Sequence, residues 1–233
     1  MEYRTKEDLV ADYLREGIIS GQFERGCRLK QAEIAETLKL SITPVREALK
    51  LLEAEGYVTR ESHHGVMVAP FEHEASDDIL GLRVQLEERL VRAAVERIGK
   101  EALAELNAIG KDFEKAVAAG SRTAARGVNY RFHCQLYAQA DLPQTFHFVK
   151  ILWAKYPFDV INKLGGRTDR AVQEHRLLLR HVAARNADKA VLAIRTHIEK
   201  GWAELRKHLQ AQRAAAASAS APAKTRTGRA RAA

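Results

Sequence analysis

The sequence has few of the features that mark secreted or membrane-spanning proteins. It holds two cysteines, Cys27 and Cys134, which form no CxxC pair, so we interpret both as reduced, buried thiols. The stretch from Met1 to Asp12 is charged throughout and does not resemble a signal peptide. No apolar run approaches the roughly 20 residues that span a bilayer. We therefore expect a soluble cytoplasmic protein with no membrane partner.

The sequence also lacks a basic excess in its first third. The net charge is +8, but residues 1–70 hold 10 Lys and Arg against 12 Asp and Glu. Residues 71–210 hold 23 basic residues against 18 acidic ones, and residues 211–233 hold five basic residues and no acidic one. Overall charge thus gives no evidence for DNA binding, which has to be judged from the placement of individual residues.

What the chain does have is helical periodicity, and the predicted fold class is mainly α. At 233 residues and 46% hydrophobic content, it can bury a core and form one or two domains. Apolar residues recur at helical spacing through residues 76–210, which predicts an antiparallel all-α bundle. Its breaks divide it into about six helices and fall near Gly99, Gly120, Leu142–Pro143, Gly165–Gly166 and Asn186.

Two further segments flank this predicted bundle. Residues 71–75 look like a linker between it and residues 1–70. Residues 211–233 have low complexity and no bulky apolar residue, so they cannot offset the entropy of ordering. We expect them to form a disordered basic tail, which could add non-specific DNA affinity by counterion release.

Residues 1–70 carry the order of elements of a winged helix-turn-helix. The first helix has Thr5 as its cap and Gly21 as its stop. The third has Thr43 as its cap, Pro44 at its first helical position and Gly56 as its stop. The predicted helices cover Thr5–Ser20, Gln31–Leu38 and Pro44–Glu55, and the predicted strands are Tyr57–Arg60 and Val66–Ala69, around a turn at Gly65.

The third helix is then the predicted DNA-recognition helix; the alternatives are an ordinary helix–turn–helix packing with a surface arginine, or a winged helix that binds protein. Such a helix enters the major groove with its N-terminal residues towards the bases. Arg46 in its first turn could donate two hydrogen bonds to a guanine, which is worth roughly 1–3 kcal/mol of discrimination. The wing tip around His64 and Gly65 could contact the DNA backbone or minor groove.

The stretch "RLKQAEIAETLKLSITPVREALKLLEAEGYV", with the later "HHGVMV", closely resembles the DNA-binding domain of the GntR family of bacterial transcription regulators. The resemblance implies a homodimer on a palindromic, double-stranded operator. Two positions depart from the family pattern, because Ile42 replaces a usual arginine and Ala32 another basic contact. We therefore expect altered operator recognition, with Ile42 reading a thymine methyl. The implied DNA-binding residues are Ser41, Ile42, Thr43, Pro44, Val45, Arg46, His64 and Gly65.

Four residues of the predicted bundle have the spacing of a metal site. Asn129 and His133 lie at i and i+4 on one helix face. His175 and His197 flank the turn "ARNADKA" at similar distances, so they should lie level on two antiparallel helices. Three imidazoles and one amide oxygen suit Zn²⁺, Ni²⁺ or Mn²⁺. The same spacing also fits a purely structural histidine cluster.

Residues 76–210 resemble the FCD ligand-binding domain of the FadR-like branch of the GntR family. Its metal-binding members place an Asp or Asn four residues before a His and two further His on the last two helices, which matches Asn129, His133, His175 and His197. The resemblance implies that a small organic acid binds beside the metal. Arg83 matches a family arginine that faces this cavity, so we expect it to bind the effector carboxylate.

The leading hypothesis is therefore a regulator, a repressor by usual family behaviour, whose operator binding responds to a metal-bound carboxylate effector. The alternative is a constitutive dimeric DNA-binding regulator with no effector, in which the histidines are structural. A metalloenzyme is disfavoured because no HExxH motif is present. Glu174 is also expected to point about 100° away from His175 on a helix.

Overall fold

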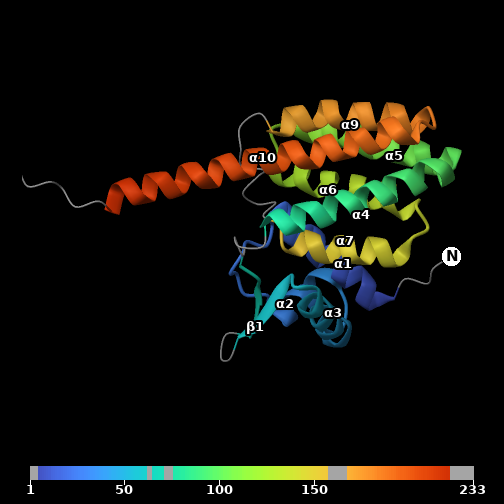
Figure 1. The fold of residues 1–233 in the computed structure, drawn as a ribbon. Helices are drawn as coiled ribbons and strands as arrows, with labels where there is room; N and C mark the ends of the chain where they lie inside the picture. The colour runs from blue at the N-terminus through green and yellow to red at the C-terminus, as the bar shows by residue number, and fades with distance from the viewer. Residues whose placement is uncertain (1–4, 62–64, 71–75, 157–166, 221–233) are drawn as a thin grey trace, which may run out of the picture.

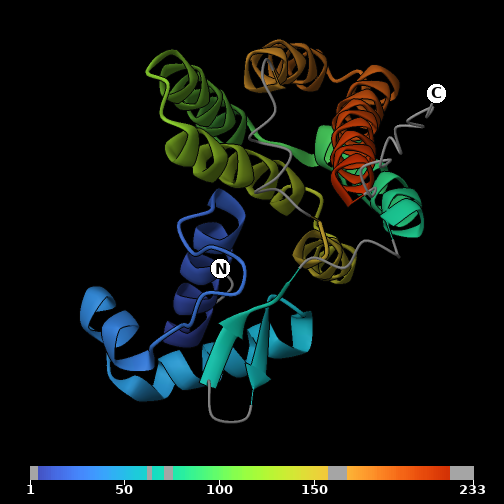
Figure 2. The same ribbon diagram turned by 90° about the vertical axis from the view of Figure 1, so that its left-hand side faces the viewer.

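The computed structural model describes residues 5–61, 65–70, 76–156 and 167–220. These residues form a small head (residues 5–70) packed against a helical bundle (from residue 76), as two views show (Figures 1 and 2). The head consists of α1 Lys6–Ser20, α2 Gln31–Leu38, α3 Ile42–Glu55, β1 Val58–Glu61 and β2 Gly65–Val68. The described helices of the bundle are α4 Ser76–Arg97, α5 Lys100–Ala118, α6 Arg122–Ala138, α7 Pro143–Ala154, α9 Arg167–Ala183 and α10 Ala187–Ser220. The predicted mainly α fold, with a winged head and an all-helical bundle, is confirmed.

Helix α1 begins and ends where its capping residues predict. The Thr5 hydroxyl accepts a hydrogen bond from the Asp8 N–H at 3.2 Å, and the Asp8 carboxylate accepts one from the Thr5 N–H at 3.0 Å. This capping box satisfies two backbone donors that otherwise lack partners. Gly21, at φ 78°, ends the helix in the left-handed conformation that glycine adopts without strain.

Helix α3 begins two residues earlier than predicted. Its N-cap is Ser41, not Thr43, and Ile42 is the first helical residue. Pro44 therefore occupies the third helical position. All four N–H groups of the first turn lack an intrahelical partner, so a proline is tolerated throughout this turn and does not mark its first residue. The predicted stop at Gly56 is confirmed.

The wing is an antiparallel pair in which Val58 faces Val68 and Glu61 faces Gly65. Each strand is displaced by one residue from its predicted span. Tyr57 and Ala69 lie just outside the ladder, although the Ala69 N–H still donates to the Tyr57 carbonyl at 2.9 Å. Residues 62–64, which include His64, lie outside the described residues, as does the predicted linker 71–75.

Helix α10 is longer than the sequence suggested, because it continues to Ser220 and not to residue 210. Figure 1 shows it extending past the rest of the bundle. Disorder from residue 211 was predicted only from the lack of apolar side chains that could be buried. Residues 211–220 are rich in alanine, which has the highest helix propensity, so a helix already begun can propagate through them. Residues 221–233 lie outside the described residues.

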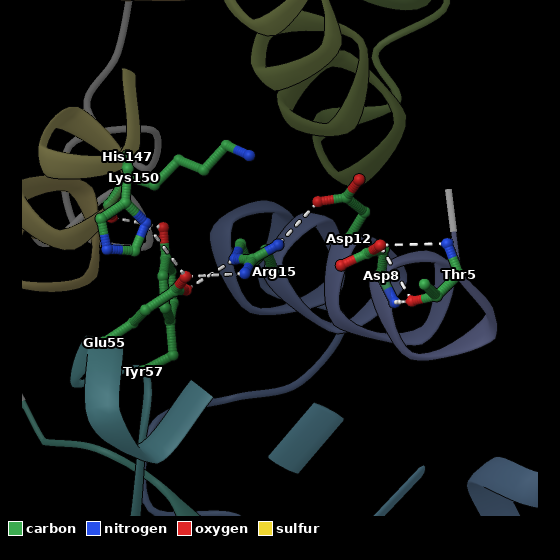
Figure 3. A network of polar contacts seen from close by, with 8 residues as sticks. All are labelled: Thr5, Asp8, Asp12, Arg15, Glu55, Tyr57, His147 and Lys150. Atoms are coloured by element: carbon green, nitrogen blue, oxygen red, sulfur yellow. Dashed lines mark hydrogen bonds and ion pairs between the residues drawn. The ribbon is translucent and has the colours of Figure 1, made fainter. Parts of the chain in front are cut away.

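Head and bundle share one apolar core and a polar junction. Buried side chains of α1 and α3, such as Leu14 and Leu52, belong to the same cluster as Tyr130 and Trp153 of the bundle. Inside the head, buried Arg15 of α1 donates to both carboxylate oxygens of Glu55 at the end of α3, at 2.7 and 2.8 Å, and to Asp12 (Figure 3). The Tyr57 hydroxyl donates to the backbone carbonyl of Lys150 on α7 at 2.8 Å. The bundle thereby positions the head directly.

Candidate metal centre, cavity and DNA-binding surface

The predicted DNA-binding residues of α3 divide into exposed and buried side chains. Pro44 and Val45 are buried in the head, so their side chains cannot reach a base. The backbone N–H groups of the first turn still have no intrahelical partner and favour a phosphate. The exposed residues of this set are Ser41, Ile42, Thr43 and Arg46.

The structure adds an arginine beside the wing that the sequence reasoning missed. Arg28 is exposed, and its backbone pairs with Met67 of β2. A Cβ added to Gly65 would lie 3.5 Å from the Arg28 Nε, so the guanidinium lies against the first residue of β2. The only signal in the sequence was the basic character of "ERGCRLK". Arg28 is thus a further basic group on the wing side of the head.

The three predicted histidines of the metal site come together from three helices. His133 lies on α6, His175 on α9 and His197 on α10, and each offers a ring nitrogen within 4.8 Å of the others. Their ring centroids are 5.1 to 5.2 Å apart. All three are nearly inaccessible, with exposed fractions of 6%, 2% and 9%. Asn129, one turn before His133, lines the adjoining cavity.

For two of these histidines, hydrogen bonds indicate which ring nitrogen is protonated and which is free to bind a ligand. The Tyr137 hydroxyl donates to Glu87 Oε2 at 2.7 Å, so its oxygen is left to accept from His133 Nδ1 at 3.4 Å. His197 Nδ1 lies 2.8 Å from Glu174 Oε2. Both rings therefore carry their proton on Nδ1 and keep the lone pair on Nε2 for a ligand. A histidine held by a carboxylate in this way is a frequent arrangement at metal centres.

His175 is unusual because neither of its ring nitrogens has a hydrogen-bond partner among the described residues. Its ring is stacked on Phe132 at a centroid distance of 4.3 Å. A buried polar group without a partner is costly. A metal ion bound to one of its nitrogens would supply the missing partner, so the donor set fits such an ion.

All three imidazoles are in the neutral form that binds a metal. Burial lowers the pKa of His133 to about 4, although Glu87 opposes the shift. Burial, together with the neighbouring His133 and His197, lowers the pKa of His175 well below its ordinary value. Burial and the charge of Arg167 do the same to the pKa of His197. Neutral rings leave the lone pairs available without prior loss of a proton.

Glu174 has a role that the sequence reasoning missed. It does point away from His175, as helical geometry requires, but it points towards His197 on the adjacent helix. Arg167 donates to the same carboxylate oxygen at 3.2 Å. Glu174 therefore orients a predicted ligand across the α9–α10 pair, and only the antiparallel packing of these helices brings it there.

A cavity opens beside the three histidines. The space available to the centres of water molecules is about 50 Å³, which is room for several waters or a small molecule. Its described lining includes one carboxylate, Glu87, and four arginines that can favour an anion: Arg83, Arg122, Arg126 and Arg167. Trp153, Tyr156 and Ile19 supply part of the apolar wall.

Arg83 lines this cavity as predicted, but it is already paired. Its Nε donates to Glu87 Oε1 at 2.7 Å, and its guanidinium lies 4.4 Å from the centre of the Tyr156 ring. Arg122 and Arg126 were missed, although a signal existed. They precede Asn129 and His133 on α6 at spacings of three and four residues, which places all four on one helix face.

Comparisons with known families and proteins cover both parts of the chain. The FCD domain family model matches residues 78–200, and the model described as bacterial regulatory proteins, gntR family, matches residues 6–68. Among curated proteins, the HTH-type transcriptional regulator McbR of Escherichia coli is 27% identical over 77% of this chain and 83% of its own length. The gluconate operon transcriptional repressor of Bacillus subtilis is 36% identical over 40% of this chain and 39% of its own length.

A solved structure agrees with these matches at the level of the fold. The structure of E. coli McbR/YncC superposes with a TM-score of 0.76 at 23% identity, covering 89% of this chain and all of that chain. Among the described residues, no helix is both long enough and apolar enough to cross a membrane.

Proposed function

The chain belongs to the GntR family of bacterial regulatory proteins and carries an FCD domain; from this premise, we propose that its operator binding responds to a metal-bound small organic acid. Its relatives are transcription regulators, not enzymes, and the protein is accordingly a DNA-binding transcription regulator. The single observation that carries the proposed effector site is the convergence of His133, His175 and His197 beside an arginine-lined cavity.

For the DNA-binding half, we propose a homodimer whose two heads read a palindromic operator. Ser41, Thr43 and Arg46 are exposed at the N-terminus of α3, where a recognition helix makes its base contacts. Ile42 is 45% exposed and apolar, which suits contact with a thymine methyl. Gly65 is the first residue of β2 in the wing; the predicted contact His64 lies outside the described residues. Repression of the regulated genes is proposed from the usual behaviour of the family.

For the metal, His133, His175 and His197 would be the ligands, with Asn129 from the same face of α6. A bound Zn²⁺, Ni²⁺ or Mn²⁺ would supply a Lewis-acidic position that attracts a carboxylate. Glu87, through Tyr137, and Glu174 hold two of the imidazoles in a fixed tautomer.

For the effector, the charge of the lining favours an anion. Four arginines face one glutamate, and that glutamate is already bonded to Arg83, Tyr137 and Trp153. A carboxylate can form two parallel hydrogen bonds with a guanidinium. The limited volume favours a small acid, and Trp153 and Tyr156 form part of the apolar wall beside it.

A thermal-shift panel tests the proposal. Zinc-loaded protein is mixed with acetate, succinate, malate, citrate and gluconate, in parallel with His133→Ala and the control His181→Ala, which lies on α9 outside the cluster. An acid at about 100 times its Kd stabilises the native state by about 2.7 kcal/mol. We expect a shift in the wild type and the control that is absent in His133→Ala. No shift with any acid would favour a constitutive regulator with structural histidines.

A further inference from the structure

Helix α6 has the cavity on one face and the head on another. Arg122, Ala125, Arg126, Asn129 and His133 line the cavity, at the three- and four-residue spacings of one helix face. A neighbouring face of α6, with Gly127 and Arg131, packs against α1 of the head, and Figure 2 shows the two helices next to each other. Helix α6 therefore holds a predicted metal ligand and also packs against the DNA-binding head.

The head reaches the cavity itself. Ile19, in the last turn of α1, is 3% exposed and forms part of the cavity wall. The approach of α1 to α6 is close: a Cβ added to Gly127 would lie 2.8 Å from a carboxylate oxygen of Glu16. The same Glu16 forms an ion pair with Arg131, at 3.4 Å. Any movement of α1 relative to α6 would thus change the shape of the cavity.

Arg126 belongs to both sides of this contact. It lines the cavity, and its guanidinium donates to the backbone carbonyl of Ser20 at 2.9 Å. Ser20 is the last residue of α1, where carbonyls have no intrahelical partner and a positive charge is favourable. A Cβ at Gly21 would lie 2.6 Å from the same guanidinium, so Arg126 fills the space against this helix end.

We propose that Arg126 is a positioning residue through which a bound acid loosens the head. A carboxylate in the cavity draws the Arg126 guanidinium away from the Ser20 carbonyl, and the last turn of α1 separates from α6. The carboxylate prevails because its full negative charge attracts the guanidinium more strongly than a neutral carbonyl does, and because it can accept two parallel hydrogen bonds from it. This inference rests on the proposed binding of an organic acid in the cavity.

Hydrogen exchange in the last turn of α1 measures this loosening. The Gly21 N–H donates to the Ile18 carbonyl and the Phe23 N–H to the Gly17 carbonyl, so both amides are protected only while the turn is closed. Zinc-loaded full-length protein is compared with and without succinate or gluconate, by mass spectrometry of the peptide over residues 18–23. We expect exchange to rise about tenfold when the acid binds, as loss of a charged hydrogen bond implies.

Three variants test whether Arg126 transmits acid binding to the last turn of α1 or only stabilises that turn. In Arg126→Gln the turn should exchange fast without acid and show no further change with it, while Arg126→Lys, which keeps a charged donor, should recover part of the response. Arg131→Gln removes a contact of α6 with the head outside the cavity lining. This control should keep a rise in exchange at saturating acid.

The outcomes also separate this inference from the proposed function. If acid raises the melting temperature but exchange over residues 18–23 is unchanged or slower, the coupling is wrong and acid binding stands. A full response in Arg126→Gln would likewise overturn the role of Arg126. If no acid of the thermal-shift panel raises the melting temperature of the zinc-loaded protein, the proposed function fails, and the coupling with it.

Discussion

At the residue scale, the metal centre depends on side chains that do not face the metal. Glu87 is 1% exposed and accepts hydrogen bonds from Arg83, Tyr137 and Trp153. Through Tyr137 it fixes the orientation of His133. Glu174 does the same for His197. Removing an orienting carboxylate leaves the histidine ligand in place but no longer holds its ring. The loss of metal affinity should therefore be smaller than that caused by removing the histidine itself.

We therefore expect Glu174→Ala to weaken zinc binding by about 10- to 100-fold, the range typical for loss of a group that orients a metal-bound histidine. Isothermal titration of the metal-free protein with zinc measures this. The control is Glu114→Ala, because Glu114 forms an ion pair with Arg176 on the exposed side of α5 and α9. Equal affinities of Glu174→Ala and wild type would mean that His197 is not a ligand.

A second residue-scale prediction concerns the wing. Arg28→Ala should weaken binding to double-stranded DNA of any sequence and reduce the slope of log affinity against log salt by about 1, because one phosphate contact is lost. Fluorescence anisotropy over a salt series measures the slope. Lys115→Ala, on α5 of the bundle, is a control that removes the same charge from an exposed site. If both variants bind like wild type, Arg28 does not touch DNA.

At the element scale, short-range chemistry determines the helix ends, which is why the sequence predicted most of them. Thr5, Gly21 and Gly56 act on their own turn, so their effect is readable without the fold. Pro44 was less informative because any position in a first turn accepts it. The extension of α10 was missed because propensity, and not burial, supports it.

Substituting alanine for two glycines in helix interiors should change the free energy of unfolding in opposite directions. A Cβ at Gly17 of α1 would lie 2.4 Å from the Phe23 ring, whereas a Cβ at Gly81 of α4 would meet nothing within 4 Å. Gly17→Ala should destabilise the protein by about 1–3 kcal/mol through overpacking. Gly81→Ala should stabilise it by about 0.5–1 kcal/mol, since alanine loses less backbone entropy in a helix.

Urea unfolding of the two variants beside wild type gives both free-energy differences. A stabilised Gly17→Ala would show that the Phe23 ring moves aside at no cost. A destabilised Gly81→Ala would place an unrecognised contact at that face of α4.

At the scale of the whole molecule, head and bundle are packed together more closely than the sequence predicted, because it indicated two separate parts joined by a linker. Among the described residues, four hydrogen bonds from side chains to backbone cross the junction, from Arg25 to Ala154 and Tyr156, from Tyr57 to Lys150 and from Arg126 to Ser20. Their partners lie about a hundred residues apart along the chain. Periodicity and spacing predicted the cluster of three histidines, because it depends only on the α9–α10 hairpin and on one face of α6. They could not reveal contacts that depend on how the two parts dock.

We accordingly expect head and bundle to unfold in one transition, because their buried side chains form a single cluster. Differential scanning calorimetry of the metal-free protein should give one peak, with calorimetric and van't Hoff enthalpies that agree. Two resolved peaks, or a calorimetric enthalpy well above the van't Hoff value, would show that the head melts independently. Tyr57→Phe, which removes one junction hydrogen bond, should lower the temperature of this single peak without splitting it.

The presence of Ile19 in the cavity wall has a practical consequence for anyone building a biosensor from this protein. A common design fuses only the ligand-binding portion to a fluorescent reporter. Here that portion alone would have a cavity open on the side where α1 normally lies. Its dose-response curve would describe a recess that the intact regulator never offers, and compounds ranked with it would be ranked for the wrong shape.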